Sequence, residues 1–130
     1  MSAQQARKTR DPLTHQVIGA AIEVHQTLGP GLDKNIYAQC LAWELEHNGV
    51  EVQRQVPLPV RYKDLDFDKA HELDMLVDDR LVVEIRCVER VLPVHEAQLT
   101  TYLKLSEADT GLLINFNSPL LRDGLKRVTL

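Results

Sequence analysis

The sequence predicts a single α/β domain, a mixed sheet flanked by helices in the order α-α-β-β-β-α-β. The chain has 130 residues, 44% of them hydrophobic, which suits one globular domain and leaves no room for a second. Apolar residues recur at helical spacing in the first part of the chain and alternate with polar ones from Val50 onward. We expect residues 13–130 to form this domain, preceded by a flexible N-terminal tail over 1–12.

Two helices are expected first. Asp11-Pro12 is typical of an N-cap followed by proline at the first helical position, and apolar residues then recur until Gly29-Pro30-Gly31 ends the helix. A second helix is predicted from Asp33 to Asn48-Gly49, a left-handed C-cap signal. Its expected buried residues are Ile36, Tyr37, Cys40, Leu41 and Leu45.

The strands follow from residue 50. Alternation marks a half-buried strand over 50–62, which its prolines place at a sheet edge. A hairpin is expected from strands at 70–77 and 81–87 around Asp78-Asp79-Arg80. Pro93 opens a helix to about residue 105, a short buried strand follows at 111–116, and 125–130 is a candidate edge strand. A parallel crossover through the helix should join the strands at 81–87 and 111–116.

Composition excludes several classes of protein. Fifteen Lys and Arg against nineteen Asp and Glu give a net charge of -4, so a nucleic-acid site must be local rather than a matter of bulk charge. The two cysteines lack the spacing of a disulfide framework or a structural zinc site. No signal-peptide stretch or membrane-length apolar run is present. We therefore expect a cytoplasmic protein that does not associate with a membrane.

Charged residues interrupt both strands of the predicted hairpin. Glu84 and Arg86 are two apart and so share a face, and Asp74 lies in the partner strand. Burying a lone carboxylate costs several kcal/mol, so these residues either pair on a solvated sheet face or form a site. If Asp74 and Glu84 face the same way, their oxygens suit Mg²⁺ or Mn²⁺ holding a phosphate and an attacking water.

The hairpin register decides whether the two carboxylates meet. For Asp74 to oppose Glu84, paired residue numbers must sum to 158, which leaves Asp78-Asp79-Arg80 as a three-residue loop. A two-residue turn at Asp78-Asp79 would put the carboxylates on opposite faces. The sequence favours the longer loop because it pairs apolar Val77 with Leu81, and it predicts a left-handed conformation at Arg80.

The spacing of Asp74, Glu84 and Arg86 resembles the PD-(D/E)XK nuclease motif, in which the last position is usually lysine. Gln98 and Tyr102 resemble the Q-x-x-x-Y motif of RecB-like members. The chain from about residue 13 onward is also similar to the small bacterial GxxExxY proteins, which are grouped with this superfamily. The similarity lies in an ordered set of segments at 18–25, 28–31, 55–59, 92–98 and 111–116.

The resemblance implies a restriction-endonuclease-like core and hydrolysis of nucleic acid that depends on Mg²⁺ or Mn²⁺. DNA is the more expected substrate than RNA, and so small a domain is expected to work as a homodimer. Asp74 and Glu84 would ligate the ion, with the Ile85 carbonyl as a third ligand. Arg86 would steady the phosphate or the water. Gln98 and Tyr102 would brace the site.

Two departures from the family pattern leave an alternative open. Lys34 stands where the GxxExxY motif has glutamate, and Asp33 or Glu23 would have to supply an acidic group instead, although Glu23 can equally be a surface charge. Arg86 keeps the positive charge of the usual lysine but cannot deprotonate to act as a base. The alternative is a catalytically degraded nuclease fold that binds nucleic acid or a protein partner.

Two further residues are assigned structural roles. His25 matches the family pattern but lies on an apolar helix face, which favours a packed, hydrogen-bonded core histidine. Cys87 is expected to be a core residue rather than a nucleophile.

Overall fold

The computed structural model describes residues 11–130 and confirms the predicted α/β order. The elements are α2 (Pro12–Leu28), α3 (Lys34–His47), β1 (Val52–Tyr62), β2 (Leu65–Val77), β3 (Leu81–Arg86), α4 (Pro93–Ser106), β4 (Thr110–Asn115), the 3-10 helix η1 (Leu121–Gly124) and β5 (Leu125–Thr129). Most of the predicted tail, residues 1–10, lies outside the described residues, and Pro12 already belongs to α2.

The five strands form one mixed sheet in the order β1-β2-β3-β4-β5. β1 lies at an edge, as its prolines predict, and β5 forms the other edge from the candidate strand at 125–130. β3 and β4 are parallel and are connected through α4, which confirms the predicted crossover, and the other neighbouring strands are antiparallel.

Local signals place the helix ends. The Asp11 side chain accepts a hydrogen bond from the Leu13 N–H and caps α2. α3 ends before Gly49, whose φ of 78° is the left-handed conformation that the C-cap signal predicts. The prediction that Ile36 is buried is wrong, because it is 43% exposed at the start of α3 while the next residue, Tyr37, points into the core.

Two hydrophobic clusters lie on the two faces of the sheet. Helices α2 and α3 pack side by side against one face, where Val83 and Ile85 of β3 point. α4 packs against the opposite face through Leu99 and Leu103, next to Val82. Residues of β3 therefore alternate between the two clusters, and Glu84 and Arg86 belong to the α4 face.

The side chains of β2 that point to a given face of the sheet change at Asp74. Leu73 packs in the cluster under α4, whereas Met75 packs in the cluster under α2 and α3, although residues two apart share a face in a regular strand. Opposite Asp74 in β1 lies Gln55, whose φ is 55° and which has no partner in the ladder. The ribbon is therefore sharply twisted at this point.

The β2–β3 hairpin has the register that brings the carboxylates together. Met75 pairs with Val83 and Val77 with Leu81, so paired numbers sum to 158 as predicted. The prediction of a left-handed Arg80 is wrong, because Asp78 and Asp79 take φ values of 52° and 57° instead. Aspartate tolerates this conformation better than arginine, and the Arg80 N–H closes the turn onto the Val77 carbonyl.

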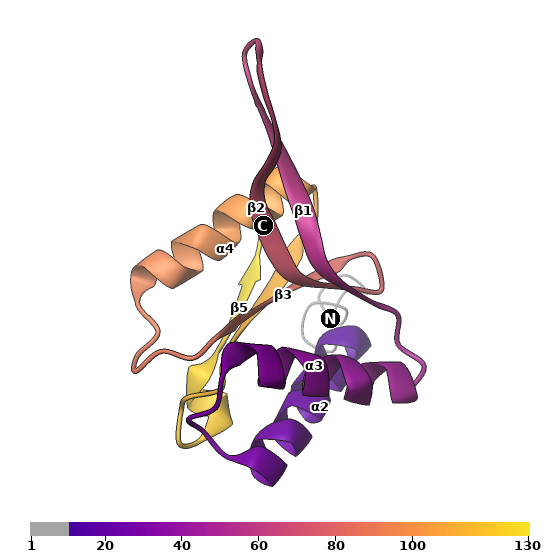
Figure 1. Cartoon of the computed structure of the whole chain (residues 1–130), viewed down its shortest axis with the longest axis vertical. Helices are drawn as coiled ribbons and strands as arrows, with labels where there is room; N and C mark the ends of the chain where they lie inside the picture. Colours follow the sequence, from indigo (N-terminus) through magenta and orange to yellow (C-terminus); the bar gives the residue numbers. More distant parts are fainter. Residues whose placement is uncertain (1–10) are drawn as a thin grey trace, which may run out of the picture.

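Beyond the site, β1 and β2 continue as a projecting hairpin (Figure 1). β2 begins at Leu65, five residues before the predicted start at 70, because the alternating residues after the Lys63-Asp64 turn remain paired with β1. Residues 61–70 are exposed on both faces of this ribbon. Within residues 11–130, no helix has the length and apolar character needed to cross a bilayer.

Candidate functional site

Asp74 and Glu84 meet where the β2–β3 ladder opens. Their side chains take over bonds that backbone groups would make in a regular ladder: the Ile85 N–H donates to Asp74 Oδ2 at 2.8 Å, and the Asp74 N–H donates to Glu84 Oε2 at 3.3 Å. Glu84 is only 1% exposed, whereas Asp74 is 14% exposed. The predicted same-face arrangement is therefore present, with Glu84 in the interior and Asp74 nearer the surface.

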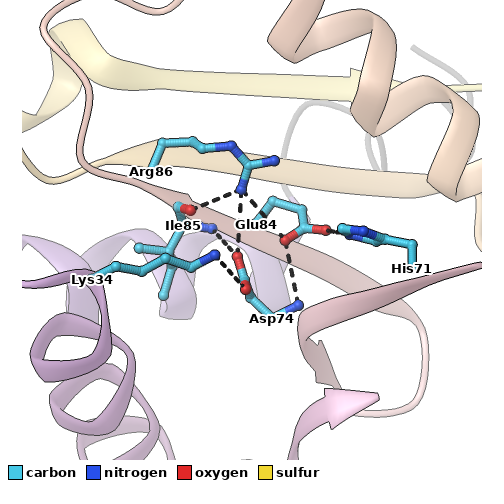
Figure 2. Close-up of polar contacts among 6 residues, drawn as sticks. All are labelled: Lys34, His71, Asp74, Glu84, Ile85 and Arg86. Carbon is cyan, nitrogen blue, oxygen red and sulfur yellow. Dashed lines mark hydrogen bonds and ion pairs between the residues drawn. The ribbon is translucent and has the colours of Figure 1, made fainter. Parts of the chain in front are cut away.

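One nitrogen of Arg86 lies within reach of all three predicted ligand oxygens. Its Nη1 is 2.9 Å from the Ile85 carbonyl oxygen, 3.6 Å from Asp74 Oδ2 and 3.8 Å from Glu84 Oε2 (Figure 2). The three oxygens thus converge on a single point, and a positive charge stands at that point.

Lys34 brings a second cation to Asp74 from the other side. It is the first residue of α3, and its Nζ lies 2.8 Å from Asp74 Oδ1 (Figure 2). The positive charge of Lys34 therefore acts directly on a predicted metal ligand. A cavity of about 280 Å³ opens beside this ion pair and is lined in part by Asp33 and Arg54, which leaves Asp74 accessible from solvent.

The pKa values of the two carboxyl groups shift in opposite directions. Burial raises the pKa of Glu84 to about 9, and its hydrogen bond to Asp74 and the repulsion from that carboxylate add to the effect. Burial would also raise the pKa of Asp74, but hydrogen bonds from Glu84 and Lys34 outweigh it and hold that pKa below its ordinary value of 3.8. At neutral pH the pair therefore carries one negative charge, on Asp74.

His71 is a site residue that the sequence did not reveal. Its Nε2 lies 2.9 Å from Glu84 Oε1, and its ring stacks on that of Tyr102, with centroids 3.8 Å apart and planes 9° apart. Period-two alternation from Asp74 places His71 on the opposite face, and only the twist at Asp74 brings both to Glu84. Tyr102 thus contacts His71 through its ring, and its role in bracing the site stays a prediction.

Two predicted site residues stay outside this group. Glu23 is exposed and lines a groove between α2 and α3, on a helix that packs on the sheet face opposite Glu84, and its assignment as a metal ligand stays a prediction. Gln98 is exposed on α4, and among residues 11–130 no hydrogen bond joins it to either carboxylate.

His25 has the structural role assigned to it, and Cys87 is partly buried against the hydrophobic cluster under α2 and α3. His25 is 9% exposed and its Nε2 is hydrogen-bonded to the Ser118 carbonyl at 2.8 Å, as predicted for a core histidine. Burial raises the pKa of Cys87, which favours the neutral thiol over a nucleophilic thiolate.

The donor set suits a hard divalent cation by its chemistry. Two carboxylates and a carbonyl are oxygen ligands of the kind that Mg²⁺ and Mn²⁺ prefer, and the point on which they converge already holds a cationic nitrogen. Residues 11–130 contain no cluster of three or more His, Cys, Asp or Glu side chains able to hold an ion. Such an ion would therefore need the Ile85 carbonyl and water as further ligands, and Arg86 would have to move aside.

Comparison with known proteins identifies one family. A family model described as the PD-(D/E)XK nuclease superfamily matches residues 11–128. No curated protein and no solved structure is significantly similar to the chain. The matched segment includes every residue of the site.

Proposed function

Because the chain belongs to the PD-(D/E)XK nuclease superfamily, we propose that it is a metal-dependent nuclease that hydrolyses phosphodiester bonds of nucleic acid. The observation that carries this proposal is the convergence of two carboxylates and a backbone carbonyl on one point beside Arg86. The proposed ion is Mg²⁺ or Mn²⁺. DNA is favoured over RNA as the substrate, and a homodimer is the proposed form because it could act on two strands.

Each residue of the site has a proposed role that follows from its chemistry. Asp74, Glu84 and the Ile85 carbonyl would hold the ion, which when bound polarises a phosphoryl oxygen and lowers the pKa of a coordinated water. Arg86, freed from the three oxygens, would bind a phosphate oxygen and stabilise the charge that develops there. It cannot accept a proton from water because its guanidinium stays protonated.

A second candidate function rests on the two cations. Arg86 already neutralises the three converging oxygens, and Lys34 pairs with Asp74 at 2.8 Å, so the protein can supply internally the positive charge that an ion would bring. On this reading the fold is a catalytically degraded nuclease that binds nucleic acid or a protein partner.

Metal titration separates the two functions. Purified protein is titrated with Mg²⁺ and Mn²⁺ in a calorimeter, and cleavage of single-stranded and duplex DNA and RNA is followed with and without each ion. The nuclease proposal expects ion binding and ion-dependent cleavage that Glu84→Ala abolishes. Nucleic-acid binding without ion binding or cleavage would contradict it and favour the degraded fold.

A further inference from the structure

His71 contacts the more deeply buried of the two carboxylates without belonging to the motif. It lies in β2 opposite Leu58 of β1, and it is 29% exposed, between Glu84 on one side and the ring of Tyr102 on the other. The contact joins three elements, β2, β3 and α4, around a single carboxyl group.

We propose that His71 is a positioning residue that donates its Nε2–H to Glu84 Oε1 and thereby turns Oε2 toward Asp74 and Arg86. The role of this contact in metal binding rests on the proposed function, whereas the hydrogen bond itself does not. The stacked Tyr102 ring holds the imidazole plane, so Tyr102 acts through its aromatic face.

The environment of Glu84 assigns the direction of this hydrogen bond. Oε2 faces the Asp74 N–H at 3.3 Å and Arg86 Nη1 at 3.8 Å, while Oε1 faces His71 Nε2 at 2.9 Å. A carboxyl group buried to 1% exposure needs a hydrogen-bond partner for each oxygen, and because Glu84 hydrogen-bonds to Asp74 on the Oε2 side, Oε1 is left as the acceptor. Without His71, Oε1 would lose its donor, and the side chain could rotate and misdirect Oε2.

The tautomer of His71 tests the hydrogen bond in the absence of any metal. Long-range ¹H–¹⁵N spectra of the full chain, with the His71 signals assigned by their loss in His71→Gln, should show the Nε2–H tautomer. Glu84→Ala should shift the His71 Nε2 signal and leave those of His15 in place. An Nδ1–H tautomer, or a Nε2 signal indifferent to Glu84→Ala, would overturn the proposal.

Manganese affinity tests the positioning role. By electron paramagnetic resonance of free Mn²⁺, His71→Ala should weaken binding about tenfold, the loss typical of a residue that orients a ligand. His71→Gln should recover most of the affinity because its amide N–H can replace Nε2–H. His15→Ala, at an exposed position of α2, is the control.

The variants also separate the competing explanations. Equal loss in His71→Gln and His71→Ala would make His71 a metal ligand rather than a positioning residue, and unchanged affinity in His71→Ala would remove it from the site. Thermal melts of each variant show whether it is folded. If the wild type binds no Mn²⁺, the proposed function fails, and the tautomer measurement still decides the His71–Glu84 contact by itself.

Discussion

At the scale of single residues, the charge around Asp74 is set by Lys34 and Arg86, which reach it from α3 and β3. Asp74 is the one ionised carboxylate of the pair, so the two cations outnumber the negative charge. The cluster is therefore positive before any ion binds. This positive charge favours the binding of a phosphate group and opposes the binding of a divalent cation. Substitution of each of the two cations shows which of these effects dominates.

Arg86 distinguishes electrostatic from general-base catalysis. If it works through its charge, Arg86→Lys should retain or raise cleavage while Arg86→Ala abolishes it. If the superfamily lysine must act as a base, the wild type should be nearly inert and Arg86→Lys active. The measurement is the single-turnover cleavage rate at saturating Mg²⁺, and equal rates in all three proteins would exclude Arg86 from the mechanism.

Lys34 is expected to weaken ion binding. Lys34→Glu replaces the cation 2.8 Å from Asp74 Oδ1 by a carboxylate and should tighten Mn²⁺ binding at least about tenfold, which is about 1.4 kcal/mol. Lys34→Met, which removes the charge without adding a ligand, should give a smaller gain. A titration in which Lys34→Glu binds no more tightly than wild type would place Lys34 outside the electrostatics of the site.

At the scale of elements, the β1–β2 ribbon owes its twist to a strained residue. Gln55 adopts φ 55° opposite Asp74, a conformation that costs a non-glycine residue about 1–2 kcal/mol. The twist brings His71 and Asp74 to the same carboxyl group. Strain of this kind persists where the surrounding structure fixes it, and it is common at functional sites.

Glycine at this position should therefore stabilise the protein. Gln55→Gly removes the strain and should raise the free energy of unfolding by about 0.5–1 kcal/mol after the entropy cost of glycine is subtracted. Gln53→Gly, in the regular part of the same strand opposite Leu76, should lower it by about 0.5–1 kcal/mol. Urea unfolding of both variants checks the sign, and destabilisation in both would show that Gln55 is not strained.

Tyr37 shows the same dependence of one element on another. Its hydroxyl donates to the Gly29 carbonyl and accepts from the Leu32 N–H, and its ring stacks on Phe116 at 4.5 Å. It thus ties the loop between α2 and α3 to the end of β4. The loop position in turn sets where α3 begins, and so where Lys34 stands.

At the scale of the whole molecule, periodicity predicts the elements and the pairing but not the full site. Apolar alternation and the Val77–Leu81 pair are local signals, and they correctly predict the strand order of the hairpin and its register. The contact of His71 with Glu84 depends on a twist that breaks the alternation. The contact of Lys34 with Asp74 depends on the reach of a long side chain from another element. Such contacts depend on tertiary geometry, which one-dimensional patterns do not contain.

The pH dependence of stability follows from the raised pKa of Glu84. Glu84 has an ordinary pKa of 4.5 and a folded-state pKa of about 9, so the folded protein holds a proton that the unfolded chain releases between these values. The free energy of unfolding should fall as pH rises through this window, by at most about 1.4 kcal/mol per pH unit. Burial lowers the pKa of His71 from its ordinary value of 6.5. Below pH 6.5 this shift makes the free energy of unfolding rise with pH, opposite to the effect of Glu84.

The decline should therefore be clearest from about pH 7 to 9, a window set by the shifts of Glu84 and His71. Glu84→Gln carries no titrating group and should flatten the curve, whereas Glu46→Gln, at an exposed position of α3, should keep the wild-type slope. Urea unfolding across this range provides the measurement. A wild-type curve that is level or rises would show that Glu84 is ionised in the folded protein.

The bond between the Ile85 N–H and Asp74 Oδ2 gives one backbone amide an unusual sensitivity to solvent exchange. Amides held by ladder carbonyls in a central strand exchange with deuterium only when the sheet opens. The Ile85 amide, in a residue with no exposed surface, is released whenever the Asp74 side chain swings away. Its exchange rate therefore reports the motion of a single carboxylate, and a ligand that draws Asp74 outward will unlock this amide while the rest of β3 stays closed.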